Sequence, residues 1–370
     1  MEEKLRKASK RISQSLGKIY KLINKKKLQN FLEQIKNISK ELNKKTAFSI
    51  GNTVKKETDI YYTPIRITEQ VVVGGVIISN EKEAKEICKL IDGKVNYIFV
   101  DSEKKIPNLG RKILSNIERI ARDIIKKTKI YSYKANDLTV EAIDTLLCKL
   151  YENDKRNLGG KKISIVGCGN IGFKVALKLV ERGANVYINR RNTKLLKTFS
   201  NTINLVKNKY THAKVRYTSN NLSISKNADI LIGLSQGTVC IYENMVNLMK
   251  ENSIIVDVGK GTISAKAIEL AKKKNVNLLR LDVSIAFKAM IYNNLLSENI
   301  FDKNYGRKKI KEVTIISGGI YGYKNEIVVD SIYNPKIIYG ISNGRGELKK
   351  NISKKEELII ANLKKNNFEK

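Results

Sequence analysis

Three glycines, spaced as Gly167-x-Gly169-x-x-Gly172, constrain the fold of this chain more than any other feature. They follow an apolar run at 162–166 and open an amphipathic helical pattern at 171–182. In that setting the first glycine allows a tight turn, the second lets a phosphate approach the backbone, and the third lets the helix pack closely on the strand. The N-terminus of the helix then faces the phosphates. The motif predicts a Rossmann βα unit that binds a dinucleotide.

The end of the second predicted strand indicates which dinucleotide binds. An NAD site usually has Asp or Glu about 20 residues after the glycines, where the carboxylate accepts from the ribose hydroxyls. Here the strand at 186–188 runs into Asn189-Arg190-Arg191, without a carboxylate. Two guanidiniums suit a 2′-phosphate through charge and bidentate geometry, so we predict NADP, with NAD as the second choice.

Further β/α units follow in series, which predicts a doubly wound parallel sheet. The strands predicted at 229–233 and 253–258 both run into small and polar residues, at the edge where cofactor and substrate meet. Lys260 follows the second of these strands. Its ammonium could bind an anionic substrate, or the side chain could simply point into water, and the sequence favours neither alternative.

The predicted fold class is α/β, with the Rossmann domain in the C-terminal half, a smaller α/β domain before it and a helical segment at the start. By residue number we expect a basic helical segment at 1–45, an α/β substrate domain at 46–157, the Rossmann domain at 158–290, and a C-terminal extension at 291–370 that packs back on the two domains.

Composition limits the classes of partner. The net charge of +35 is spread along the chain, lysine far outnumbers arginine, and no RNA- or DNA-binding motif is present. We therefore expect a small-molecule substrate and no specific nucleic acid, and we leave homo-oligomer formation open. No apolar run approaches the roughly 18 residues of a membrane-spanning helix, so no membrane partner is expected. The four cysteines stand far apart, which excludes a thiolate metal site and favours the cytoplasm.

The run from about 158 to 283 resembles the NAD(P) domains of the shikimate dehydrogenase, glutamyl-tRNA reductase and methylenetetrahydrofolate dehydrogenase group. The glycine motif, Asn189-Arg190, the run at 228–232 and the run at 255–259 follow that group in order and spacing. Asn189-Arg190 is similar to the Asn-Arg-Ser/Thr signature of the NADP-using members, departing from it by the extra Arg191. The resemblance thus implies NADP.

Upstream, Asn136-Asp137 is similar to the Asn-Thr-Asp segment of shikimate dehydrogenases, although the threonine is missing. There the acid helps to hold the substrate and pairs with a catalytic lysine, which implies such a role for Asp137. From the residues alone, two alternatives are open: Asn136 or Asp137 only caps a helix that starts at Leu138, or the cap also contacts substrate. The single histidine, His212, is expected away from the reactive face, so Lys134 is the candidate proton donor.

The expected site residues fall into three groups. For catalysis they are Lys134 and Asp137; for cofactor binding Gly167, Gly169, Asn170, Ile171, Gly172, Asn189, Arg190, Arg191, Ser235, Gly237 and Gly259; and for substrate binding Asn136, Asn52 and Lys260, with no metal ligands.

The predicted function is an NADP-dependent oxidoreductase that transfers a hydride to or from a small, anionic carbonyl/alcohol or imine substrate. Two alternatives stay open. One is a non-catalytic dinucleotide-binding protein. The other is an NAD-dependent enzyme similar to S-adenosylhomocysteine hydrolase, whose cofactor domain has the same order of elements. The NAD site of that enzyme has an acidic residue at the position of Asn189, which counts against this alternative.

Overall fold

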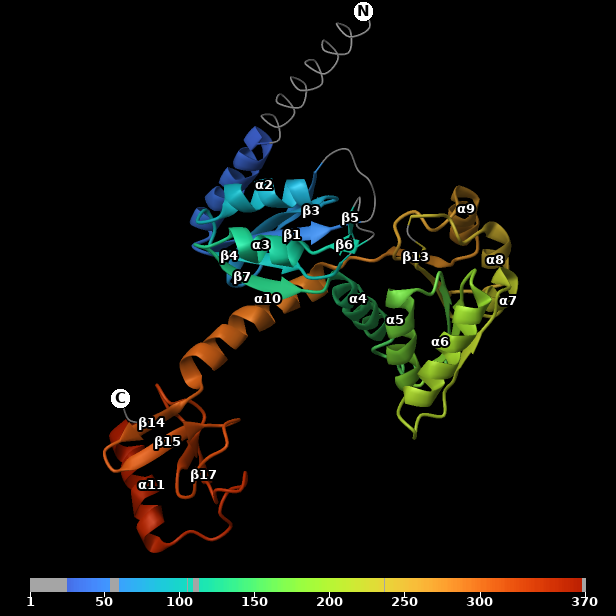
Figure 1. The fold of residues 1–370 in the computed structure, drawn as a ribbon. Coiled ribbons are helices and arrows are strands. Elements are labelled where there is room, and N and C mark those ends of the chain that lie inside the picture. Colours follow the sequence, from blue (N-terminus) through green and yellow to red (C-terminus); the bar gives the residue numbers. More distant parts are fainter. Residues whose placement is uncertain (1–24, 54–59, 105, 109–112, 236, 368–370) are drawn as a thin grey trace, which may run out of the picture. The chain divides into compact units, whose positions relative to one another are not determined.

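The computed structural model describes residues 25–53, 60–104, 106–108, 113–235 and 237–367 (Figure 1). The start of the basic segment predicted at 1–45 lies outside these ranges. The chain forms two compact units that divide between Lys288 and Ala289. Within the described residues, no helix has the length and apolar character needed to cross a membrane.

The first unit opens with a five-stranded sheet in the order β2-β3-β1-β4-β7. Its strands are β1 (Lys45–Asn52), β2 (Tyr61–Ile67), β3 (Val71–Ile78), β4 (Tyr97–Asp101) and β7 (Lys129–Tyr133), and a small hairpin, β5 (Ile106–Asn108) and β6 (Ile113–Ser115), stands apart. All neighbours pair in parallel except β2, which runs antiparallel to β3. Strands β1 and β3 are buried along most of their length, as is usual for the central strands of a mostly parallel sheet.

Helices α2 (Glu81–Ile91), α3 (Ile117–Ile124) and a helix over residues 25–41 share a core with this sheet. The last of these buries Leu28, Leu32 and Ile35, each at most 2% exposed. Gly74 on β3 lets it approach, because a Cβ there would lie 2.6 Å from Ile35 and 2.7 Å from Phe31. The described part of the basic segment is therefore a structural helix of the first sheet domain.

The second sheet is six-stranded and parallel, in the order β10-β9-β8-β11-β12-β13. Its elements are β8 (Lys162–Val166), α5 (Asn170–Glu181), β9 (Asn185–Asn189), α6 (Thr193–Val206), β10 (Val215–Tyr217), α7 (Asn221–Ser225), β11 (Ile230–Gly233), α8 (Glu243–Asn247), β12 (Ile254–Asp257), α9 (Ala265–Lys273) and β13 (Asn277–Arg280). This is the doubly wound order of a Rossmann fold, with the reversal between β8 and β11. The predicted α/β class and parallel sheet are confirmed.

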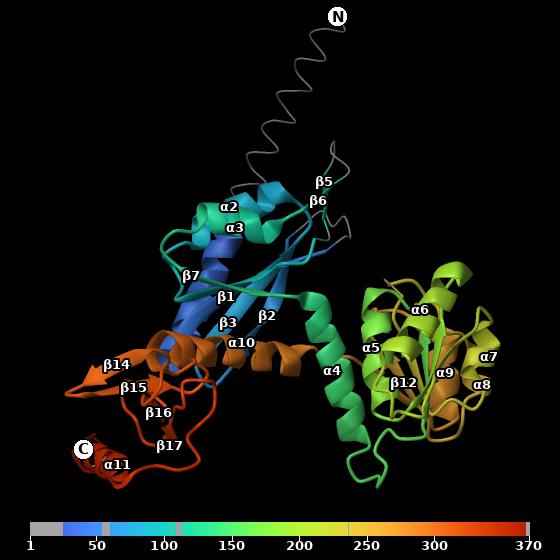
Figure 2. The same cartoon turned by 60° about the horizontal axis from the view of Figure 1, so that its bottom comes forward.

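Helix α4 (Ala135–Leu150) follows β7 of the first sheet and packs along α5 of the second, as Figure 2 shows. It contributes Val140, Ile143 and Leu147 to the core of the second sheet. By its packing, α4 thus belongs to the Rossmann domain, ahead of the boundary expected at 157–158.

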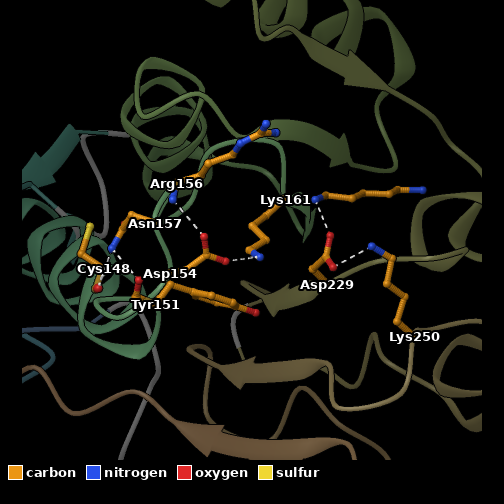
Figure 3. A network of polar contacts seen from close by, with 9 residues as sticks. Cys148, Tyr151, Asp154, Arg156, Asn157, Lys161, Asp229 and Lys250 are labelled. Atoms are coloured by element: carbon orange, nitrogen blue, oxygen red, sulfur yellow. Dashed lines mark hydrogen bonds and ion pairs between the residues drawn. The ribbon is translucent and has the colours of Figure 1, made fainter.

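A polar network holds the loop between α4 and β8 (Figure 3). The Asn157 amide donates to the carbonyls of Cys148 and Tyr151, both at 3.0 Å. The ammonium of Lys161 lies 2.6 Å from Asp154. The next residue, Lys162, donates its backbone N–H to the Asp229 carboxylate at 2.7 Å. The same carboxylate accepts from the Lys250 ammonium at 2.7 Å. These bonds tie the start of β8 to β11, the two strands whose opposite ends form the switch point.

The second unit has its own antiparallel and parallel pairings in the order β14-β15-β16-β17. Its elements are β14 (Arg307–Ile310), β15 (Val313–Ser317), β16 (Ile327–Val329), β17 (Ile338–Ile341) and α11 (Lys354–Asn367), preceded by α10 (Ser284–Glu298), which crosses the division, and a π-helical turn at Asn299–Asn304. Ile315, Ile327, Ile341 and Leu363 form a core of this unit's own side chains. The segment at 291–370 is therefore a domain-like unit, and its packing on the rest of the chain stays a prediction.

Candidate dinucleotide site

A cavity of about 720 Å³ opens at the carboxyl edge of the second sheet, where the strand order reverses. Most of its lining comes from four stretches of the Rossmann domain: residues 166–172, 189–192, 234–235 and 238–240 together with Tyr242. Asn136 and Asn221 also line it. The described lining residues include two arginines and no Asp, Glu, His or Lys. The cavity thus offers positive charge and small or neutral side chains.

The glycine turn forms the floor of this cavity. Gly167 has a φ of +88°, which a side chain would strain, and a Cβ there would also lie 2.8 Å from the Ser235 nitrogen. A Cβ on Gly169, in contrast, would meet no atom within 4 Å. A Cβ on Gly172 would lie 3.2 Å from the Cys168 sulfur. Two of the glycines therefore allow close packing of the chain itself, whereas Gly169 leaves open space beside the backbone.

The N-terminus of α5 faces the same space with unused donors. Gly169 is the N-cap and brings no side-chain cap, and the first helical hydrogen bond runs from Phe173 N–H to the Gly169 carbonyl at 2.9 Å. The N–H groups of Asn170, Ile171 and Gly172 have no acceptor within the described part of the chain. Free N–H groups at a helix N-terminus attract anions. The turn and the open space at Gly169 fit the pyrophosphate of a dinucleotide.

The end of β9 carries the two arginines. Arg190 donates from Nη1 to the Cys168 carbonyl at 3.4 Å, and its guanidinium lies 5.7 Å from the centre of the Phe199 ring. Arg191 is exposed. Asn189 is buried, and its amide donates to the Thr218 carbonyl at 2.8 Å, so this side chain joins β9 to the chain after β10. Arg191 is the more available cation of the pair.

Ser235 also lines the cavity, but the other residues expected after the later strands do not. Gly237 and Gly259 lie outside the lining, and a Cβ on Gly259 would fall 1.8 Å from the Ser235 carbonyl oxygen. Gly259 is thus explained by the close approach of two loops. Lys260 is exposed, has a φ of +57° and does not line the cavity either.

Asp257 shapes the loop in which Gly259 lies. Its carboxylate is 4% exposed and accepts from the Gly261 N–H at 2.9 Å and from the Thr262 hydroxyl at 2.7 Å. Burial acts to raise the pKa of Asp257, but these hydrogen bonds outweigh burial, and the pKa lies below its ordinary value. The carboxylate therefore stays ionised and holds the loop.

The expected helix cap at Asn136 or Asp137 is wrong. Helix α4 begins at Ala135, with Lys134 as its N-cap residue and no side-chain cap. Asp137 lies in the first turn and pairs with the ammonium of Lys174 on α5, because α4 packs along α5 in register. Lys134 is exposed, and neither Lys134 nor Asp137 lines the cavity.

Asn136 alone of the upstream candidates reaches the cavity, and it links the cavity to the first sheet. Its backbone N–H donates to a Glu103 carboxylate oxygen at 3.2 Å. The Glu103 carbonyl in turn accepts from the amide of Asn52 at 2.8 Å. Asn52 is 7% exposed, and its Oδ1 lacks a hydrogen-bond partner in the described structure. Asn52 thus lies at the carboxyl edge of the first sheet, with an acceptor to offer.

Sequence reasoning missed several lining residues after α6 and β11, namely Asn221, Thr238, Val239, Cys240 and Tyr242. Asn221 lies on α7, a short helix that was not predicted; its cap, Asn220, accepting from two N–H groups, was the available signal. The Cys240 sulfur lies 3.3 Å from the Ser235 hydroxyl, and burial raises the pKa of the thiol. His212 is exposed and outside the lining.

Residues 148–288 match the D-isomer specific 2-hydroxyacid dehydrogenase, NAD binding domain. The expected NAD(P)-binding domain of the dehydrogenase and reductase kind is therefore confirmed. The matching family differs from the group that the sequence resembles, although both have the same type of domain.

Two curated relatives match over part of the chain. Ketol-acid reductoisomerase (NADP(+)) of Buchnera aphidicola subsp. Schizaphis graminum is 31% identical over 109 residues, which are 28% of this chain and 21% of that protein. Glutamyl-tRNA reductase of Thermosipho melanesiensis is 26% identical over 152 residues, which are 40% and 36% of the two chains. The chain thus spans only about a fifth and about a third of these relatives.

Solved structures are similar at a low level. A dipicolinate synthase chain from Bacillus subtilis has 15% identity and a TM-score of 0.35 over 70% of this chain and 96% of its own. L-tryptophan dehydrogenase of Nostoc punctiforme has 13% identity and a TM-score of 0.40 over 70% and 79% of the two chains.

Proposed function

We propose that the protein is an NADP-dependent oxidoreductase that transfers a hydride to or from a small, anionic carbonyl/alcohol or imine substrate. The observation that carries this proposal is the end of β9, where Arg190 and Arg191 line the dinucleotide cavity and none of the described lining residues is a carboxylate. A 2′-phosphate is favoured by such a site, and a free ribose hydroxyl pair gains no acidic acceptor.

Different residues of the cavity would bind different parts of the cofactor. Gly167 forms the tight turn, Gly169 admits the pyrophosphate to the backbone, the N–H groups at the start of α5 bind it, and Arg191 pairs with the 2′-phosphate. A bound nicotinamide dinucleotide supplies or accepts the hydride. Ser235 lies across the switch point from the glycine turn, at the end of β11.

The substrate is proposed to meet the cavity from the edge of the first sheet. Asn136 reaches the lining and connects through Glu103 to Asn52, whose free Oδ1 can accept from a substrate hydroxyl or amine. The matching family is named for 2-hydroxyacids and one relative for a ketol-acid, which supports a small anionic carbonyl or alcohol compound.

The described lining holds no Asp, Glu, His or Lys, and its side chains that could move a proton are Cys240 and Tyr242. Lys134 and Asp137 flank Asn136 and keep their predicted role as proton donor and acid partner, with Lys174 as an additional partner of Asp137. The same absence favours one alternative, a dinucleotide-binding protein without catalysis. The four free cysteines support the proposed location in the cytoplasm.

Calorimetric titration of the full chain with NADPH and with NADH tests the proposal. We expect NADPH to bind on the order of tenfold more tightly at low salt, with the ratio falling as salt screens the exposed arginine. Tighter binding of NADH would refute the cofactor assignment and favour the NAD-dependent hydrolase alternative. NADPH binding without turnover of any 2-hydroxyacid or 2-oxoacid would favour the non-catalytic alternative.

A further inference from the structure

A second cavity, of about 450 Å³, lies within the C-terminal unit and takes no part in the dinucleotide site. Its lining includes Val328 of β16, Leu348, Tyr321 and Tyr339. Its volume is in the range of small-ligand sites. The cavity lies in a unit with its own core, so its shape depends on residues 289–370 alone.

The two tyrosines line the cavity and remain open to solvent. A Cβ on Gly346 would lie 2.8 Å from Cε1 of Tyr321, so the backbone at Gly346 packs closely on that ring. A Cβ on Gly318 would lie 3.7 Å from Cε2 of Tyr339, which is ordinary contact. Tyr321 is 83% exposed and Tyr339 is 53% exposed. Aromatic rings left uncovered in this way are suited to stacking on a planar partner.

Two exposed cations, Lys324 and Arg345, lie in the loops that line this cavity. Arg307 lies 4.3 Å from the centre of the Tyr323 ring, donates to the Tyr321 carbonyl at 3.1 Å and forms an ion pair with Glu326 at 2.7 Å, so it fixes the tyrosine loop and its charge is balanced. The turn at Gly344 packs on Lys324, since a Cβ there would lie 3.0 Å from the Lys324 nitrogen. Lys324 and Arg345 are exposed, and neither side chain has an acidic partner in the described part of this unit.

The acid at the cavity narrows the choice of ligand. Glu347 lines the cavity and accepts from the Asn343 amide at 3.3 Å. A carboxylate there disfavours a phosphate inside the cavity and favours a neutral ring that carries N–H donors. The cations outside the cavity favour phosphates around it. A nucleobase stacked on the tyrosines, in a strand whose phosphates contact Lys324 and Arg345, satisfies both conditions.

We propose that the C-terminal unit binds single-stranded nucleic acid, with a base stacked on Tyr321 and Tyr339. Such stacking tolerates any sequence, so the proposal agrees with the lack of a sequence-reading motif. The net charge by itself does not indicate nucleic-acid binding, because it is spread along the chain. The two exposed tyrosine rings in one cavity point to bases as the ligand. The proposal is independent of the dinucleotide site.

Fluorescence anisotropy with the full chain tests this proposal, using end-labelled oligouridylate and oligodeoxyuridylate of about twelve nucleotides, which differ only in the sugar. We expect binding at low salt that weakens as salt rises. Tyr321→Ala with Tyr339→Ala should weaken binding by about tenfold per ring, whereas Tyr321→Phe with Tyr339→Phe should bind as the wild type does, because phenylalanine keeps the ring. A preference between the two oligonucleotides identifies RNA or DNA as the natural source.

Tyr333→Ala is the matched control, because Tyr333 is 65% exposed in the same unit but lies outside the cavity. It should bind as the wild type does. Equal loss in this control, equal binding of duplex DNA, or unchanged binding by the double alanine variant would each overturn the proposal in favour of general charge attraction. Loss of a wild-type dimer in the double variant would overturn it in favour of a second copy of the chain. NADPH affinity should be the same in all variants.

Discussion

Arg182 on α5 donates to both carboxylate oxygens of Asp144 on α4, from Nε at 2.6 Å and from Nη2 at 2.7 Å. The Asp144 side chain is only 8% exposed. Lys178 lies 3.6 Å from the same carboxylate and 3.0 Å from Glu141 one turn before it. This ladder fixes α4 on α5 and so sets where Asn136, at the other end of α4, meets the dinucleotide cavity.

Arg182→Met should lower the free energy of unfolding by about 2 kcal/mol, because it leaves a buried carboxylate with only the more distant Lys178. Urea unfolding at neutral pH measures the change. Lys149→Met is the control, since Lys149 pairs with exposed Glu152 and is itself 72% exposed. That change should cost less than about 0.5 kcal/mol. Equal costs for the two variants would show that the Asp144 pair does not stabilise the packing of α4.

Gly169→Val should abolish dinucleotide binding and leave the melting temperature within about 2 °C of the wild type. A Cβ there would meet no protein atom within 4 Å and φ is −110°, so the added side chain extends from the backbone into the space proposed for the pyrophosphate. Gly259→Ala should lower the melting temperature, since its Cβ would fall 1.8 Å from the Ser235 carbonyl oxygen and the loop must shift. Thermal melts and NADPH titration of both variants separate the two roles.

Arg191→Ala should weaken NADPH binding by about tenfold and leave NADH binding unchanged, because one exposed charge-assisted contact is lost. Arg190→Ala should weaken both cofactors, since Arg190 also supports the Cys168 carbonyl of the glycine turn. Titration of each variant with both cofactors checks this. Parallel losses for NADPH and NADH in Arg191→Ala would remove Arg191 from the 2′-phosphate site.

Asp257→Asn should destabilise the protein at pH 7, and the difference from the wild type should shrink in acid. The pKa of Asp257 lies below its ordinary value of 3.8 in the folded state, so its stabilising effect is complete above that value and is lost as the pH falls through the lower folded pKa. Urea unfolding of both proteins at pH 7 and near pH 3 measures this. A difference that grows in acid would contradict the assigned direction.

Asn136→Ala should lower turnover in the proposed hydride transfer by at least tenfold with little effect on unfolding, because Asn136 lines the cavity. Asp137→Asn tests the catalytic role of the acid, since its pair with Lys174 is half exposed and adds less than about 1 kcal/mol of stability. Steady-state rates with saturating NADPH provide the measurement. Full activity of Asp137→Asn would leave Asp137 with only its ion pair to α5.

The local pattern of the sequence was enough to predict the Rossmann domain. The spacing of Gly167, Gly169 and Gly172 between an apolar strand and a helix is a short-range signal, and the arginines at the end of β9 follow it at a fixed distance. The alternation of strands and helices predicted the parallel sheet, because each unit must bury its apolar face against the next.

Only the tertiary structure decided which residues meet across elements. Asp137 could not be assigned to Lys174 from the sequence, because their contact depends on the register of α4 along α5. Gly259 resembled a cofactor glycine until the loop after β11 was seen to pass 1.8 Å from its Cβ position. Tyr321 and Tyr339 come from different strands and loops, and the folding of the C-terminal sheet brings them to one cavity. Periodicity along a chain determines local elements, whereas such contacts depend on how the elements pack.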